Sequence, residues 1–129
     1  QAAGPPDPNS QFPLQCRNMG RNHEAGMVLG MGTDSGTSVA WTAVTEIRDM
    51  VRCGLTPMEG ILAATRVNAE LLELDDLGMV AAGKNASFVV LDANPLDDIN
   101  NLRRISEVYL RGEQVDREAL RNKFMSDIM

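Results

Sequence analysis

Histidine and basic residues are scarce in this sequence. Its 129 residues include one histidine, at position 23, and no His-x-His pair, while 12 Lys and Arg face 18 Asp and Glu, for a formal net charge of −6. Nucleic-acid binding relies on clustered Lys and Arg to neutralise phosphates, so this balance argues against a nucleic-acid partner. No run of about 18 apolar residues occurs, and no membrane span is expected.

Cysteine is also rare, with only Cys16 and Cys53 present. Their spacing matches neither a disulfide framework nor a zinc knuckle. We therefore predict two reduced, partly buried thiols, and a cytoplasmic location is favoured.

What remains is the composition of a soluble globular protein. Hydrophobic residues make up 43% of the chain and charged residues 23%, and a chain of this length can bury a core. Residues 1–11 hold three of the six prolines, together with Gly, Asp, Asn and Ser. Such a segment cannot bury a face, so it predicts a loop or loose tail.

The first half of the chain alternates a strand-like run with helical patterns. Residues 13–25 predict a helix that stops at Gly26. Residues 27–32 are apolar and bounded by glycines, which favours a fully buried strand of a parallel sheet. A helical stripe follows over residues 43–51. Residues 56–59, Thr-Pro-Met-Glu, predict a capping box that starts two short helices, broken near Thr65.

The second half has the character of small strands. Residues 79–80 and 88–91 are strand-like and are separated by a turn at residues 82–85. Residues 108–115 read as a hairpin, and residues 117–126 as a charged terminal helix.

One segment concentrates functional potential, namely residues 30–36. In it a carboxylate, Asp34, follows the predicted buried strand. In parallel α/β sheets and barrels, active sites form at this carboxyl edge, where a carboxylate can bind a metal or move a proton. Asp also caps helices and turns, and position alone supports both readings equally.

Other chemistries fit the same segment less well. Residues 34–37, Asp-Ser-Gly-Thr, match the core of aspartic proteases, in which paired carboxylates share a proton. That reading requires a homodimer and conflicts with the helical pattern of residues 39–74. Residues 30–35 do not complete a dinucleotide-binding glycine pattern. Ser35 has no nucleophile elbow, and His23 lies on a predicted helix without a second histidine at metal-ligand spacing.

Several ordered motifs resemble the C-terminal portion of amidohydrolase superfamily enzymes, in particular the imidazolonepropionase-like and Xaa-Pro dipeptidase-like members. Residues 25–36 (AGMVLGMGTDSG) resemble the eighth barrel strand of that family, and residues 54–65 (GLTPMEGILAAT) resemble the helices that follow it. The return into a small β-sandwich is matched by residues 68–72, 77–78, 82–86, 89–92, 94–99 (NPLDDI) and 108–115 (VYLRGEQV).

The resemblance implies an α/β fold, a C-terminal slice of a (β/α)₈ TIM barrel (strand 8 and the following helices) plus the C-terminal strands of a small β-sandwich domain. Residues 1–12 would be an irregular tail or loop, residues 13–74 the last part of the hydrolase barrel, and residues 75–129 the sandwich strands and a C-terminal helix. A whole barrel needs about 250 residues.

The resemblance further implies a metal-dependent hydrolase acting on C–N bonds of a small amide or dipeptide-like substrate. Asp34 would be both the catalytic residue and a metal ligand, with zinc as the expected divalent metal. It would take a proton from the metal-activated water and pass it to the leaving amine. The family's other ligands, a His-x-His pair, further histidines and a carboxylated Lys, come from earlier strands and do not occur here.

This chain alone is therefore expected to be inactive, with the missing barrel half or a second copy as a partner. The residues do not indicate which groups bind substrate. An alternative is a non-catalytic remnant that acts as an interaction module.

Overall fold

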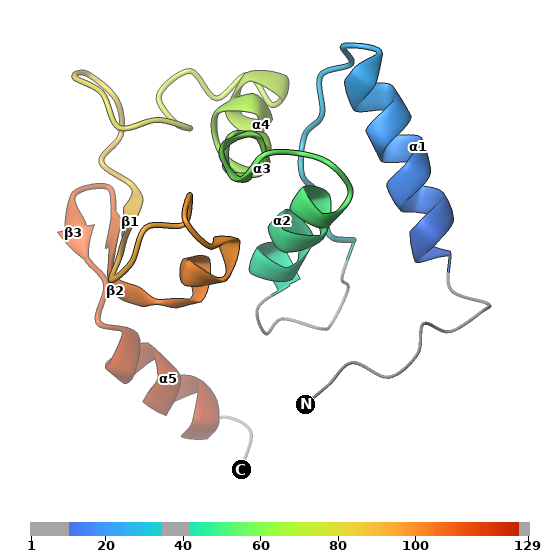
Figure 1. Ribbon diagram of the computed structural model, residues 1–129. Helices are drawn as coiled ribbons and strands as arrows, with labels where there is room; N and C mark the ends of the chain where they lie inside the picture. The colour runs from blue at the N-terminus through green and yellow to red at the C-terminus, as the bar shows by residue number, and fades with distance from the viewer. Residues whose placement is uncertain (1–10, 35–41, 127–129) are drawn as a thin grey trace.

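The computed structural model describes residues 11–34 and 42–126. Helix α1 lies on one flank of the view, a small sheet lies on the other, and helices α2, α3 and α4 lie between them (Figure 1). The described residues thus form an α/β arrangement with a three-stranded antiparallel sheet. None of the helices within these two ranges is long and apolar enough to cross a membrane.

Helix α1 spans Phe12–Glu24 and carries a proline in its first turn. It ends before Gly26, whose φ of 78° places it in the left-handed region where glycine is favoured. The sequence prediction of a helix that stops at Gly26 is confirmed. None of the α1 residues is buried, so this helix is held to the rest of the chain mainly by a few side-chain contacts.

Helices α2 (Thr42–Arg52), α3 (Pro57–Ala64) and α4 (Arg66–Leu71) build the core. The predicted stripe on α2 is confirmed, because Ile47 and Met50 are buried. Met50, Leu55 and Ala63 pack together, and the partly buried side chains Met19, Leu29 and Met31 pack against them. The core therefore joins α2 and α3 to the segment that follows α1.

The capping box at the start of α3 forms as the sequence predicts. The Thr56 hydroxyl accepts a hydrogen bond from the Glu59 backbone N–H at 3.2 Å, and the Glu59 carboxylate accepts one from the Thr56 backbone N–H at 2.7 Å. These two bonds satisfy backbone donors that the first helical turn leaves without intrahelical partners.

Removal of this cap has a defined expected cost. Thr56→Ala should lower the free energy of unfolding by about 1 kcal/mol, because it leaves an N-terminal N–H of α3 without its acceptor. Urea denaturation measures the change. Thr56→Ser, which keeps the hydroxyl oxygen, should lose much less, and an equal loss in both variants would contradict the role of the cap.

Residues 27–34 differ from the sequence prediction. They form no strand, and Met27 and Val28 are 56% and 70% exposed, so the expected buried parallel strand is wrong for the described chain. An apolar run becomes a buried strand only when neighbouring strands take up its backbone groups and other elements, usually helices, cover both faces of the sheet. Within residues 11–34 and 42–126 no strand pairs with this segment.

The sheet is built from β1 (Phe88–Leu91), β2 (Ile105–Leu110) and β3 (Glu113–Gln114), in that spatial order. Phe88 pairs with Tyr109, and their rings stack with centroids 4.7 Å apart. Arg111 and Gly112 both have positive φ, as a two-residue hairpin turn requires. The predicted strand at 88–91 and the hairpin are confirmed, whereas the strand-like reading of residues 79–80 is wrong.

Two further helices complete the second half. A 3₁₀ helix, η1 (Ile99–Arg103), contacts both α2 and β1 and so joins the helical core to the sheet. Ile99 is the buried residue of η1. The sequence patterns did not indicate this 3₁₀ helix. Helix α5 (Arg117–Ser126) matches the predicted terminal helix.

Candidate functional site

Asp34 lies at the end of the irregular segment that follows α1. Its φ of 44° is in the left-handed region, which Asp tolerates better than most non-glycine residues. Asp34 is exposed and opens onto a cleft of about 460 Å³. The cleft is walled by α1, by residues 29–34 and by α2, so Asp34 stands at the junction of three segments.

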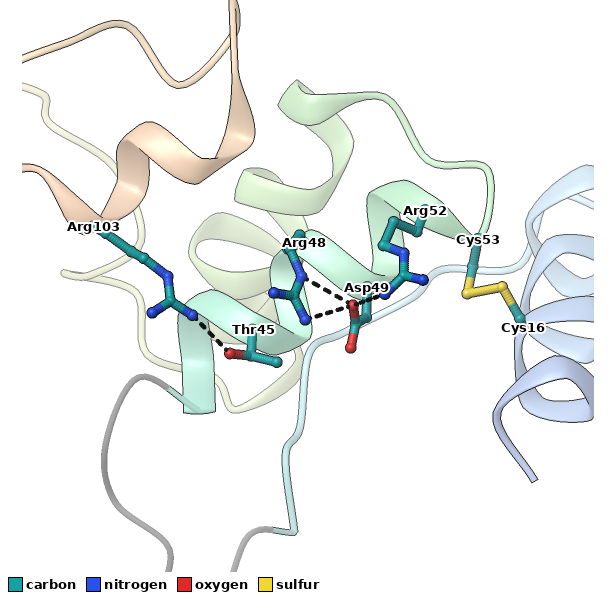
Figure 2. A network of polar contacts seen from close by, with 7 residues as sticks. All are labelled: Cys16, Thr45, Arg48, Asp49, Arg52, Cys53 and Arg103. Carbon is teal, nitrogen blue, oxygen red and sulfur yellow. Dashed lines mark hydrogen bonds and ion pairs between the residues drawn. A yellow bond between two sulfur atoms is a disulfide. The ribbon is translucent and has the colours of Figure 1, made fainter. Parts of the chain in front are cut away.

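Two further carboxylates, Glu46 and Asp49, enter the same cleft from α2. Asp49 Oδ1 accepts hydrogen bonds from Arg48 Nε at 3.1 Å and Arg52 Nη1 at 3.2 Å, and the two guanidinium groups flank it in Figure 2. Because two cations hold this carboxylate, Asp49 is a structural charge and a poor candidate for binding a metal.

Glu46 is the other acidic side chain of the cleft. Burial raises the pKa of its carboxyl, and the neighbouring Asp49 carboxylate raises that pKa further. Glu46 is therefore easier to protonate than an exposed glutamate. The sequence contained no signal for it, since a glutamate within a helical stripe looks like an ordinary solvated residue.

The raised pKa of Glu46 makes stability depend on pH. A group whose folded-state pKa exceeds its unfolded value stabilises the fold below the unfolded pKa, and this contribution is lost as pH rises through the folded pKa. Glu46→Gln cannot ionise, so its melting temperature should exceed that of the wild type at pH 7 and approach it near pH 3. A difference that stays constant with pH would contradict this assignment.

The two cysteines also reach this cleft, and here the sequence prediction is wrong. Cys16 of α1 and Cys53, just after α2, form a disulfide with Cα atoms 4.9 Å apart (Figure 2). Reduced thiols were expected because the spacing of two isolated cysteines carries no information on contact. The fold brings positions 37 residues apart together, within the Cα separation that a disulfide spans.

Helix α1 makes two further side-chain contacts, one near each of its ends. The Arg52 guanidinium carbon lies 5.4 Å from the centroid of the Phe12 ring. His23 Nε2 lies 3.5 Å from Glu59 Oε1. The imidazole of His23 therefore lies beside the first turn of α3 and does not line the Asp34 cleft.

The described residues do not form a metal site by themselves. No group of three His, Cys, Asp or Glu side chains converges anywhere in residues 11–34 and 42–126. Both cysteine sulfurs are consumed by the disulfide. Asp34 can thus offer one carboxylate to a cation, and further ligands would have to come from elsewhere.

A second hollow, of about 720 Å³, lies between the helices α2–α4 and the sheet. Its lining is mostly apolar and includes Ile47, Leu72, Leu77 and Phe88. Leu72 and Val80 at this hollow are 67% and 83% exposed. Side chains of this kind are usually covered by further protein when they gather in a concave surface.

A hydrogen bond joins the last residue of η1 to α2. Arg103 Nη2 donates a hydrogen bond to Thr45 Oγ1 at 3.2 Å, and Figure 2 shows this pair on the side of α2 away from the disulfide. Helix α2 is thereby joined to α1 at one end, through the disulfide of Cys53, and to η1 near the other.

Comparison with known proteins gives one family. The amidohydrolase family model matches residues 3–115. An imidazolonepropionase of Deinococcus radiodurans is 33% identical over 98 residues, which cover 71% of this chain and 25% of that protein. An adenine deaminase of Desulfitobacterium hafniense is 36% identical over 72 residues, which cover 56% of this chain and 12% of that protein.

Solved structures give the same result. A molinate hydrolase superposes with a TM-score of 0.74 at 31% identity, and a Xaa-Pro dipeptidase with methionine bound in its active site superposes with a TM-score of 0.75 at 31% identity. Each match covers 80% of this chain and 26% of the other. The chain spans about a quarter or less of the length of these relatives.

Proposed function

Because this chain belongs to the amidohydrolase family, we propose that it forms the C-terminal portion of a metal-dependent hydrolase that cleaves C–N bonds. In this proposal residues 13–74 are the last part of a TIM barrel, residues 75–129 are strands of a β-sandwich with a terminal helix, and residues 1–12 are an irregular tail. The substrate class is a small amide or dipeptide-like molecule, in line with the names of several relatives.

One observation carries the proposal. The family match runs continuously over residues 3–115, and Asp34 lies within it at the rim of a cleft. A carboxylate at the mouth of a cleft can exchange protons with a small molecule that enters. The carboxylate selected from the sequence therefore lies at a cleft that a small molecule can enter.

Asp34 would act as a proton carrier in this reaction. Its carboxylate would accept a proton from the attacking water and deliver it to the amine nitrogen as the C–N bond breaks, which avoids the expulsion of an unprotonated amide anion. A divalent metal, zinc by resemblance, would activate the water and polarise the carbonyl when bound. Asp34 would be one ligand, with the others from outside this chain.

The apolar hollow between helices α2–α4 and the sheet supports the proposal that further protein completes the enzyme. Its exposed apolar side chains favour association with the remaining portion of the enzyme, either joined to this chain or supplied as a separate piece. The same surface also supports a second candidate function, in which the chain is a non-catalytic interaction module. The aspartic protease alternative is disfavoured, because α2, α3 and α4 occupy residues that would be strands in such an enzyme.

The proposal is tested by an assay for C–N hydrolysis with amide and dipeptide substrates. This chain is combined with a polypeptide that supplies the remaining three quarters of an amidohydrolase-family enzyme. Hydrolysis should be lost after treatment with a chelator and restored by added zinc. Stable association without any hydrolysis would favour the interaction module, and chelator-resistant hydrolysis would contradict metal dependence.

A further inference from the structure

We propose that Asn68 is a positioning residue that sets the location of Asp34 by holding the backbone of Met31. Asn68 lies in α4, whereas Met31 precedes Asp34 by three residues in the segment that follows α1. This inference rests on the proposed catalytic role of Asp34, but it concerns the geometry of the chain and is tested without activity.

Two hydrogen bonds join the Asn68 amide to a single residue. Asn68 Nδ2 donates to the Met31 carbonyl at 2.8 Å, and the Met31 N–H donates to Asn68 Oδ1 at 3.1 Å. The same N–H also lies 3.2 Å from the Ala63 carbonyl. Both polar groups of the Met31 backbone are thus satisfied by α3 and α4, much as a neighbouring strand would satisfy them.

These bonds matter because they hold the backbone of this segment close to Asp34, where no neighbouring strand does so. Residues 27–34 form no ladder with any strand in the described ranges, and Met27 and Val28 are largely exposed. Met31 is partly buried against the core. The Asn68 clamp is therefore one fixed point of this segment, three residues before Asp34.

Gly30 shows that the close approach of Asn68 constrains the sequence. A Cβ atom at position 30 would lie 2.5 Å from Asn68 Oδ1 and 2.8 Å from Leu71 Cδ1 of the same helix, separations that real Cβ atoms essentially never show. A Cβ atom at Gly32 would meet nothing within 4 Å. Of these two glycines, only Gly30 is required to leave room for the amide, so the pair offers a matched comparison.

Asn68 acts through the backbone of Met31. Among the hydrogen bonds of the described residues, none joins the Asn68 side chain to that of Asp34. From Met31 only two residues lead to Asp34, whose φ of 44° lies in the left-handed region. A shift of the Met31 peptide plane would therefore move the Asp34 carboxylate relative to the cleft. The role is one of positioning, because Asn68 does not touch reacting atoms.

The test uses nuclear magnetic resonance on the full chain with Asn68→Asp and Asn68→Leu. Both variants keep the approximate shape of the side chain; the first replaces the NH₂ donor by an oxygen facing the Met31 carbonyl, and the second removes both bonds. Exchange of the Met31 amide should become about tenfold faster relative to the amides of β1 and β2, as expected for loss of about one net hydrogen bond. The amide and carboxyl resonances of Asp34 should shift with it.

The glycine pair checks the same clamp without altering Asn68. Gly30→Ala should reproduce the faster Met31 exchange and the Asp34 shifts, whereas Gly32→Ala should reproduce neither. Thr56→Ala, which weakens α3 at its far end, serves as the control for a general loss of stability and should leave the Asp34 resonances in place.

Unchanged Asp34 resonances in Asn68→Leu or in Gly30→Ala would overturn the proposal, as would equal shifts in Thr56→Ala. If the Asn68 variants do not fold, the Gly30→Ala and Gly32→Ala pair still decides the question. Failure of the proposed hydrolase function would appear separately, as absence of C–N cleavage by the assembled wild-type enzyme, and would leave these measurements intact.

Discussion

Asp34→Asn is expected to lower kcat of the assembled hydrolase by about 10² to 10⁴-fold, the range typical for loss of a general acid–base group. The amide of Asn has the shape of the carboxylate but can neither accept the proton of the attacking water nor return it to the leaving amine. Because that interaction is made in the transition state, KM should change far less than kcat. Steady-state kinetics on an amide substrate separates the two.

A matched change at another aspartate controls for the loss of charge. Asp97 is exposed in the turn before η1 and lies outside the cleft, so Asp97→Asn should retain kcat within about twofold. Wild-type kcat in Asp34→Asn would remove Asp34 from the mechanism. A rise in KM alone would reassign it to substrate binding.

Removal of the Cys16–Cys53 disulfide is expected to lower the free energy of unfolding by about 4 kcal/mol. The bridge closes a loop of 37 residues, and the chain-entropy treatment of such a cross-link gives a value of about this size. The effect should be concentrated on α1, which has no buried residue of its own. Its remaining ties are mainly the Phe12–Arg52 contact, the His23–Glu59 pair and the packing of Met19.

Urea denaturation of the Cys16→Ser, Cys53→Ser double variant measures this loss. The wild type treated with a dithiol reductant should match the double variant, and the double variant should not respond to the reductant. Thiol titration of the untreated protein should find no accessible thiol after unfolding. Two titratable thiols, or a reductant effect of equal size in the double variant, would contradict the bridge.

The parts of the fold that the sequence predicted are those with local signals. The left-handed glycine at position 26 ends α1, the Thr56-to-Glu59 capping box begins α3, and the spacing of Ile47 and Met50 gives the buried face of α2. The hairpin at Arg111–Gly112 follows from turn chemistry. Each of these features depends on residues within one or two turns of one another, which a single sequence displays directly.

The features that the sequence did not predict depend on contacts between distant positions. The disulfide and the Asn68–Met31 clamp each join residues separated by 37 positions, and no spacing rule indicates such a contact. The apolar run at residues 27–32 was read as a buried strand because its composition suits one. Burial, however, requires neighbouring strands on both sides, and the described residues contain no partner strand for it.

The candidate site shows the same division. Asp34 could be selected from its place after an apolar run and from the motifs around it. Glu46, whose burial raises its pKa, could not be distinguished from any other polar residue of a helix. The place of Glu46 in the Asp34 cleft becomes visible only in the folded chain, where α2 forms one wall of that cleft.

Under the proposed function, this chain supplies part of a catalytic site and not the whole of it. The most direct measurement is zinc-dependent hydrolysis of amide and dipeptide substrates by the isolated 129-residue chain. We expect no turnover above the rate without protein, because Asp34 has no converging metal ligands among the described residues. Zinc-dependent turnover by the isolated chain, lost in Asp34→Asn, would contradict it.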